Sequence, residues 1–125
     1  MNIDIETSFV KNYIKKEYQD RLLFELSSKK NRQRAISRFS HDSDIILINS
    51  FVKTNIEKLK QQNNEHKKIY IISEDECDGT IMELSQAFDF LEKTYMAAIL
   101  ISDKFAIVKE EIEGKEPTVL ICDKR

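Results

Sequence analysis

The chain has 125 residues, the length of one domain, and its 20 Lys and Arg residues against 22 Asp and Glu residues give a formal net charge of −2. With 41% apolar and 34% charged residues, the composition supports a folded core and excludes a disordered chain. Two glycines and one proline exclude collagen-like and other low-complexity proteins. We expect a single domain over 1–125, with a helical hairpin in 1–40 and an α/β sheet region in 45–125.

The first forty residues predict two helices. Apolar side chains recur every four residues over 6–27, as on one face of an amphipathic helix. Ser27 and Ser28 end this pattern and can cap a second, shorter helix over 29–39. Together the two helices predict the N-terminal hairpin.

The middle of the chain predicts two strands with a helix between them. Residues 45–48 are short, mostly β-branched and bounded by polar residues, which favours a buried strand, although a helical stripe also fits them. Thr54 and Glu57 match an S/T-x-x-E capping box, so a helix should begin there. The segment 68–73 is apolar on both faces, which is typical of a central strand covered on two sides.

The last part of the chain predicts a helix and three strands. A continuous apolar stripe predicts a helix from about 83 to 95. The stripe consists of Leu84, Ala87, Phe88, Leu91 and Tyr95. Strands are expected at 97–102, 105–109 and 118–122, with a tight turn over 102–104 between the first two.

After the hairpin, the elements follow the order β-α-β-α-β-β-β. Helices between strands favour neighbouring parallel strands, and the last three strands favour an antiparallel meander. We therefore predict an α+β (mixed α/β) fold whose mixed five-stranded sheet is packed by two or more helices. Its core between sheet and helix should contain Ile71, Ile72, Phe88, Leu91, Ile99, Leu100 and Ile107.

An acidic loop follows the strand 68–73. It contains Glu74, Asp75, Glu76 and Asp78, and divalent cations prefer such oxygen ligands. The loop fails the EF-hand pattern because Glu74 stands where Asp is needed, Ser85 stands where the last Glu is needed, and a strand precedes it. We expect it to bind no divalent cation tightly.

A second interpretation places this loop in a crevice. In parallel sheets, ligands bind beyond the carboxyl ends of the strands, which here would be 49–50, 73–74 and 102–103. With Asp78 nearby, such a crevice would suit a metal or a cationic ligand. We favour the alternative, a solvated turn in which Asp78-Gly79 supplies the tight backbone geometry. The candidate interaction residues of this acidic surface are Glu74, Asp75, Asp78 and Asp103.

Positive charge is concentrated in the first half. Residues 1–68 carry a net charge of +5 and residues 69–125 a net charge of −7. On the helix 29–39, Lys30, Arg34 and Arg38 would stack as a basic ridge that could contact phosphates. No aromatic residue lies among them to stack on bases. We expect the ridge to face an acidic surface, on a protein partner or on the second half of this chain, and not a nucleic acid.

The chemistry-bearing residues fit no known catalytic or cofactor motif. His41 and His66 have no Cys or His at the spacing of zinc ligands. Cys77 lies among carboxylates, which disfavour its thiolate, and Cys122 lies in an apolar strand. Two glycines are too few for a dinucleotide or P-loop fingerprint. We expect no catalytic residue, cofactor or metal.

Several short motifs resemble small bacterial proteins of unknown function. These are Tyr70-Ile-Ile-Ser-Glu74, Asp78-Gly79, Met82-x-Leu84-x-x-Ala87, Met96 and Ala106, with a looser match at Leu26-Ser-Ser-Lys-Lys-x-Arg32. The resemblance covers about 69–110. It implies a bacterial, cytoplasmic α+β protein and carries no activity.

Three features of the sequence favour a cytoplasmic protein. The chain begins with neither a basic start nor an apolar stretch, so no secretory signal is predicted. Its longest apolar runs are far shorter than the ~20 residues of a membrane-spanning helix, and two cysteines cannot form a disulfide framework.

We expect a non-enzymatic protein-interaction or regulatory module that binds a protein or itself. The alternatives are a nucleic-acid-associated protein using 29–38 and a carboxylate- or metal-dependent enzyme using 74–78.

Overall fold

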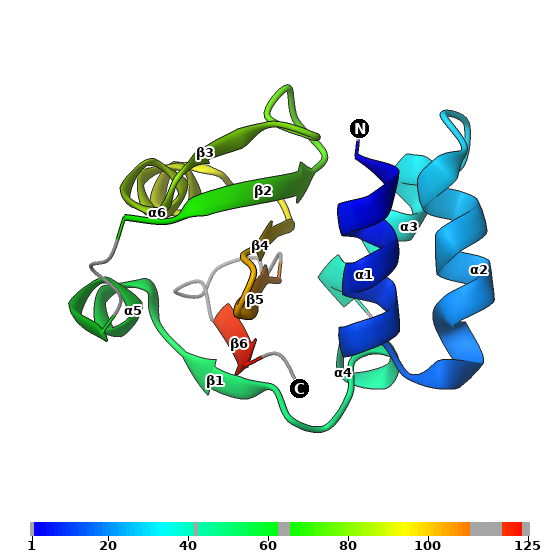
Figure 1. Cartoon of the computed structure of the whole chain (residues 1–125), viewed down its shortest axis with the longest axis horizontal. Helices are drawn as coiled ribbons and strands as arrows, with labels where there is room; N and C mark the ends of the chain where they lie inside the picture. Colours follow the sequence, from blue (N-terminus) through cyan, green and yellow to red (C-terminus); the bar gives the residue numbers. More distant parts are fainter. Residues whose placement is uncertain (1, 42, 63–65, 111–118, 124–125) are drawn as a thin grey trace.

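The chain folds into three layers, with a sheet between two layers of helices (Figure 1). The computed structural model describes residues 2–41, 43–62, 66–110 and 119–123, without the side chains of 40, 41, 43 and 44. The predicted α+β fold with an N-terminal helical hairpin is confirmed. No helix in these ranges is long and apolar enough to cross a membrane.

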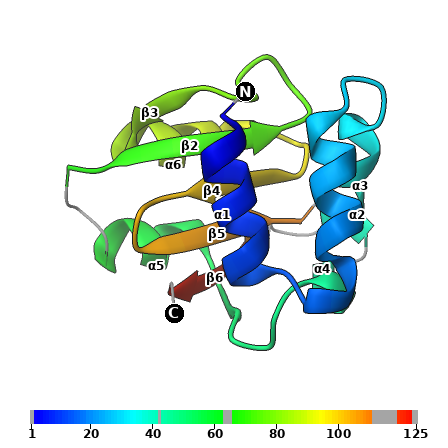
Figure 2. The same ribbon diagram turned by 45° about the vertical axis from the view of Figure 1, so that its right-hand side comes forward.

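The N-terminal layer contains more helices than predicted. It consists of α1 (Ile3–Tyr13), α2 (Lys16–Ser27), α3 (Arg32–His41) and α4 (Ser43–Ile46). Figure 2 shows α1 and α2 side by side as the two arms of the hairpin. The side chain of Asn2 caps α1 by accepting a hydrogen bond from the backbone N–H of Ile5.

The prediction of one helix over 6–27 is wrong, because the chain leaves the helix at Ile14. This residue is extended, with φ −105° and ψ 140°. The backbone N–H of Lys15 donates to the carbonyl of Ile46 at 2.8 Å, and that of Ile48 donates to the carbonyl of Tyr13 at 3.0 Å. This short bridge between distant segments replaces the helical bonds at the break.

The prediction of a strand over 45–48 is also wrong. Ile45 and Ile46 end α4, and only Leu47 forms a bridge, with Ile14. The next helix, α5 (Ile56–Gln62), begins two residues after the predicted cap at Thr54. Its cap is Asn55, whose Oδ1 accepts a hydrogen bond from the backbone N–H of Lys58 at 2.8 Å.

The described residues form six strands rather than the predicted five, in the order β1-β6-β5-β4-β2-β3. The two edges of this sheet are three-residue strands, β1 (Val52–Thr54) and β3 (Ile81–Glu83), which were not predicted. The other strands lie close to their predicted positions: β2 (Lys68–Ser73), β4 (Ala98–Ile101), β5 (Phe105–Lys109) and β6 (Val119–Asp123).

Every pair of neighbouring strands is antiparallel, so the expected parallel neighbours are wrong. The helices α5 and α6 (Leu84–Lys93) do join strands that run in the same direction, β1 to β2 and β3 to β4. However, β2 lies between β3 and β4, and three strands separate β1 from β2. The helical connections therefore cross over other strands, and hydrogen bonds form between oppositely directed strands.

Each face of the sheet carries its own core. One face packs against α1 to α4 and includes Tyr70, Ile72 and Ile99. The opposite face packs against α5 and α6 and includes Ile71 and Leu100. All of the predicted core residues are buried: Ile71, Ile72, Phe88, Leu91, Ile99, Leu100 and Ile107. The apolar pattern on both faces of 68–73 therefore indicated its covered position correctly.

The end of α6 differs from its prediction. The helix stops at Lys93, and the Tyr95 side chain is 91% exposed rather than part of the buried stripe. The ammonium group of the buried Lys109 donates to the carbonyl of Leu91 at 2.7 Å and to the carbonyl of Thr94. Burial lowers the pKa of Lys109. Lys109 thus satisfies carbonyls that the end of a helix leaves without intrahelical donors.

We predict that Leu91→Ala lowers the free energy of unfolding by about 2–5 kcal/mol, because it opens a cavity beneath α6. Tyr95→Ala, four residues further on and exposed, should change it by about 0.5 kcal/mol or less. Urea unfolding followed by circular dichroism measures both values. Equal losses in the two variants would contradict the buried position of Leu91.

Candidate functional site

The helical layer and the sheet are joined by a largely buried ion-pair network centred on Arg32, which we call the Arg32 network. Its guanidinium, at the start of α3, lies between the carboxylates of Glu6 in α1 and Asp78 after β2. The Arg32 side chain is 11% exposed and the Glu6 side chain 5%. The network therefore connects three segments that are far apart in the sequence.

The geometry of the Arg32 network uses both sides of the guanidinium fork. Nη1 and Nη2 donate to the two oxygens of Glu6 at 2.6 and 2.8 Å. Nε and Nη2 donate to the two oxygens of Asp78 at 2.7 and 2.9 Å, and Nη1 also donates to the carbonyl of Leu26 at 2.9 Å. Such paired, charge-assisted bonds fix the orientation of both carboxylates.

The electrostatic balance of this network favours the charged guanidinium. Burial lowers the pKa of Arg32, but hydrogen bonds to Asp78 and Glu6 outweigh it and raise the pKa above its ordinary value. Two carboxylates surround one cation, so further donors help to stabilise the negative charge. Asp78 accepts a hydrogen bond from the backbone N–H of Ser73 at 3.1 Å.

Tyr70, on β2, extends the network toward the start of α1. Its hydroxyl donates to Glu6 at 2.5 Å and accepts a hydrogen bond from the backbone N–H of Asn2 at 2.8 Å. Burial and the hydrogen bond to Glu6 raise the pKa of Tyr70 to about 12. The tyrosine is therefore a neutral donor at physiological pH, and it holds α1 against the sheet.

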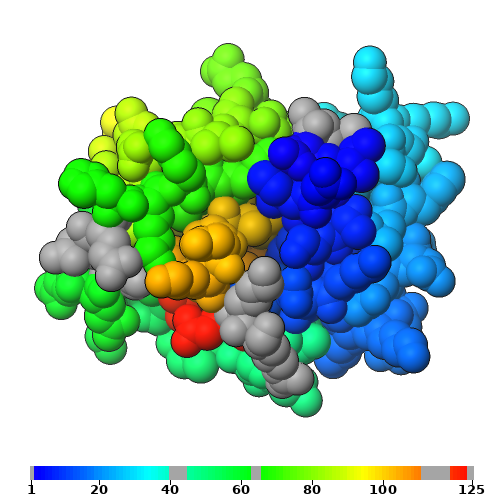
Figure 3. Space-filling model, in the orientation of Figure 1, coloured from blue at the N-terminus to red at the C-terminus, as the bar shows by residue number. Residues whose placement is uncertain are grey.

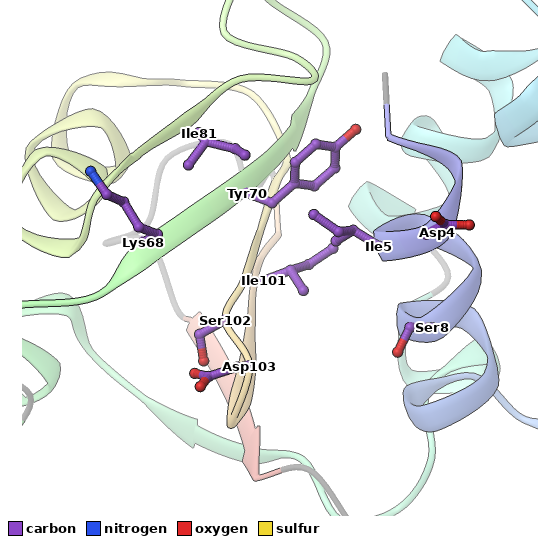
Figure 4. A pocket seen from close by; sticks show the side chains of 9 residues that line it. All are labelled: Asp4, Ile5, Ser8, Lys68, Tyr70, Ile81, Ile101, Ser102 and Asp103. Atoms are coloured by element: carbon purple, nitrogen blue, oxygen red, sulfur yellow. The ribbon is translucent and has the colours of Figure 1, made fainter.

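A groove of about 340 Å³ opens beside Tyr70, between α1 and the sheet (Figure 4). Figure 3 shows the face on which α1 (blue), the hairpin β2–β3 (green) and the β4–β5 turn (orange) meet. The groove is lined by Asp4, Ile5, Ser8, Lys68, Tyr70, Ile81, Ile101, Ser102 and Asp103. In Figure 4, Ile5 points from α1 toward Tyr70 and Ile101, which gives the groove an apolar floor.

The charged residues of the groove lie at its rim. Asp4 is exposed in the first turn of α1, and Asp103 is exposed in the turn between β4 and β5. Ser102 holds this turn, because its Oγ accepts a hydrogen bond from the backbone N–H of Phe105 at 2.9 Å. The ammonium group of Lys68 lies 2.7 Å from Glu83 on the neighbouring strand.

The acidic loop is a folded turn whose carboxylates hold its own backbone. Asp75 accepts hydrogen bonds from the hydroxyl of Ser73 at 2.7 Å and from the backbone N–H of Cys77 at 2.9 Å. Gly79 has a φ of 78°, which glycine adopts without strain, and its N–H donates to the carbonyl of Ile71 at 2.8 Å. Glu74 is partly buried beside this turn.

The structure does not assemble the crevice considered from the sequence. That crevice needed parallel strands, but β2 and β4 are antiparallel, and Ser73 pairs with Ala98 at the start of β4. Asp103 follows the opposite end of β4, beyond the pair formed by Tyr70 and Ile101. Asp103 therefore belongs to the groove, whereas Asp75 and Asp78 lie at the other end of β2.

The basic segment is also arranged differently from the expected ridge. Lys30 lies in the turn before α3, Arg34 is exposed on α3, and Arg38 donates to Glu25 on α2 at 2.6 Å. Arg38 thus faces a carboxylate of the first half of the chain. Within this segment, Arg32 is the residue that reaches the second half, through Asp78. Sequence reasoning missed this role because nothing local separates Arg32 from its basic neighbours.

The structure shows how the candidate nucleophile and metal ligands are placed. Burial, Asp75 and Glu76 raise the pKa of Cys77, so its thiolate is disfavoured. Cys122 is buried, and both cysteines are free thiols. In the described ranges, no three or more His, Cys, Asp or Glu side chains come together in a group that could hold a metal ion.

No known family model, curated protein or solved structure matches this chain. The Arg32 network fixes α1 on the sheet, and the groove lies in the space between them.

We predict that Arg32→Met lowers the free energy of unfolding by about 3–5 kcal/mol, because it leaves the buried carboxylate of Glu6 and the partly buried carboxylate of Asp78 without their cation. The matched control is Arg34→Met, two residues further along the same helix and exposed, which should change it by about 0.5 kcal/mol or less. Urea unfolding provides both values. If Arg32→Met lowers the free energy of unfolding no more than the control does, the network does not stabilise the fold as predicted.

We also predict that millimolar Mg²⁺, Mn²⁺ or Ca²⁺ leaves the melting temperature unchanged. Oxygens of Asp75 and Asp78 already accept hydrogen bonds from the turn and from Arg32. Tight binding to the folded state would raise the melting temperature, which differential scanning fluorimetry detects. Asp75→Asn serves as the control, since a rise that this variant abolishes would place a cation in the acidic loop.

Proposed function

We propose that this protein is a non-enzymatic interaction module that binds a segment of another protein in the groove between α1 and the sheet. The observation that carries the proposal is the groove itself, with an apolar floor and a charged rim. Sites with this composition recognise ligands through apolar contact, while a few polar groups provide orientation.

Exposed apolar surface next to the groove supports a protein partner. Ile81, in its wall, is 57% exposed although it stands in a strand. Apolar surface that continues from the floor of a groove to its exposed wall is typical of surfaces that another molecule covers. A protein segment would bury the Ile81 side chain together with the floor.

The two alternative functions receive less support from the arrangement of charges. The carboxylates that an enzyme would need in the acidic loop hold the turn, through Asp75, or neutralise Arg32, through Asp78. In the basic segment, Arg32 and Arg38 face carboxylates of this chain. Lys30 and Arg34 remain exposed and would be a small surface for phosphate contacts.

The proposal includes a cytoplasmic setting. Both cysteines are free thiols, which is typical of proteins from reducing compartments. The partner would then be a cytoplasmic protein or, less favoured, a second copy of this chain.

We predict that short peptides selected from a random display library bind the groove. The test compares wild type with Ser8→Trp, in which a large ring from α1 would fill the groove, and with Asp20→Trp, an exposed position on α2. Fluorescence anisotropy with the selected synthetic peptides should show at least about tenfold weaker binding to Ser8→Trp, a difference of about 1.4 kcal/mol. Asp20→Trp should bind like wild type.

Two results would refute the proposed function. One is a selection that yields no binding peptide, and the other is peptides that bind Ser8→Trp as tightly as wild type. Circular dichroism spectra and melting curves of both Trp variants establish that they are folded before binding is compared.

A further inference from the structure

We infer that the groove selects a partner segment in which an apolar side chain is flanked by Lys or Arg. This inference rests on the proposed function and names the chemistry of the partner. It follows from the charges at the rim, the shape of the floor and the way both are held in place.

The rim of the groove is negative. Figure 4 shows Asp4 on α1 and Asp103 on the β4–β5 turn, on opposite walls of the groove. Both are exposed, and the structure gives neither an ion-pair partner among the described residues. The cation that lines the groove, Lys68, lies against Glu83. A ligand therefore meets two carboxylates whose charge is not neutralised within the described structure.

The floor between these carboxylates is apolar and held in position. It is formed by Ile5, Tyr70 and Ile101, with Ile81 at its edge. The Tyr70 ring cannot turn away without breaking the hydrogen bonds of its hydroxyl to Glu6 and Asn2. A floor that is ordered before binding lowers the entropy lost on association.

An occupant must satisfy both features at once. A purely apolar segment would bury the floor but bring the carboxylates toward a dry interface without a partner, which is unfavourable. An acidic segment would be repelled. An Arg side chain next to an apolar residue fits, because its stem packs on apolar surface while its guanidinium forms paired hydrogen bonds with a carboxylate. Lys supplies the same charge with less directional bonding.

Because the two carboxylates are exposed, they should contribute mainly to selectivity and to the rate of association. Charges at the rim of an interface steer encounter and discriminate between partners, and salt screens their effect. The apolar floor should supply most of the affinity. Salt dependence therefore separates the two contributions.

The experiment uses three synthetic peptides that share a central Leu and differ in their flanking residues, which are Arg, Gln or Glu. Anisotropy titrations compare wild type with the double variant Asp4→Asn/Asp103→Asn. The matched control is Glu17→Gln/Asp20→Asn, which removes two exposed charges from α2. Melting curves verify the fold of each variant.

We expect the Arg peptide to bind wild type at least about tenfold more tightly than the Glu peptide, with the Gln peptide between them. High salt should reduce these differences. The double variant should lose most of the preference for Arg, whereas the control on α2 should keep it.

The outcomes separate this inference from the proposed function. If the Arg and Gln peptides bind wild type equally, or if the double variant keeps the preference, the inference is wrong while a groove that binds selected peptides stands. If none of the three peptides binds, the inference also fails. Analytical ultracentrifugation tests whether a second copy of this chain occupies the groove. A dimer that forms in wild type and is lost in Ser8→Trp would assign the groove to self-association and contradict the inference.

Discussion

The structure depends on one cation, Arg32, which is largely buried between two carboxylates. Arg32 brings together a carboxylate from the first helix and a carboxylate from the loop after β2, so a single guanidinium joins the helical layer to the sheet. Desolvating three charges is unfavourable, and the network is stable only because hydrogen bonds satisfy the donors of the guanidinium. Its directional bonds allow α1 few positions on the sheet, whereas apolar contacts alone would allow several.

The shape of the groove depends on this network. Tyr70 contributes its ring to the groove and its hydroxyl to Glu6, so the same side chain belongs to the Arg32 network and to the groove. A shift of α1 that widened the groove would stretch these hydrogen bonds. The opening of the groove and the stability of the layer contact are therefore coupled through Tyr70.

The sequence predicted the elements whose signals are local. The strands β2, β4 and β5 are apolar on both faces, and this pattern identifies them because helices cover the sheet on two sides. The break at Ile14 has no glycine or proline to mark it and depends on a bridge to Leu47. Three-residue strands carry too little pattern to be recognised.

The candidate site was only partly predictable, because its parts meet over long separations. Asp78 is a candidate from its acidic loop and Asp103 from its place after a predicted strand, and the crevice that would have joined them, the less favoured interpretation of the sequence, needed parallel strands. Arg32 lies 46 residues from Asp78, and its neighbours have the same charge, so no periodicity distinguishes the buried arginine from the exposed ones. The order of the strands determines which acidic residues share a surface, and this order cannot be predicted from local sequence patterns.

The shortness of the two edge strands has a consequence for how the molecule meets other chains. Edge strands expose backbone N–H and C=O groups that can recruit further strands, which is a common route to aggregation. Here β1 and β3 each have three residues, while the longer apolar strands lie inside the sheet. An incoming strand would find a ladder too short to extend into a fibril. Backbone pairing with another chain is thereby limited to three residues at either edge of the sheet.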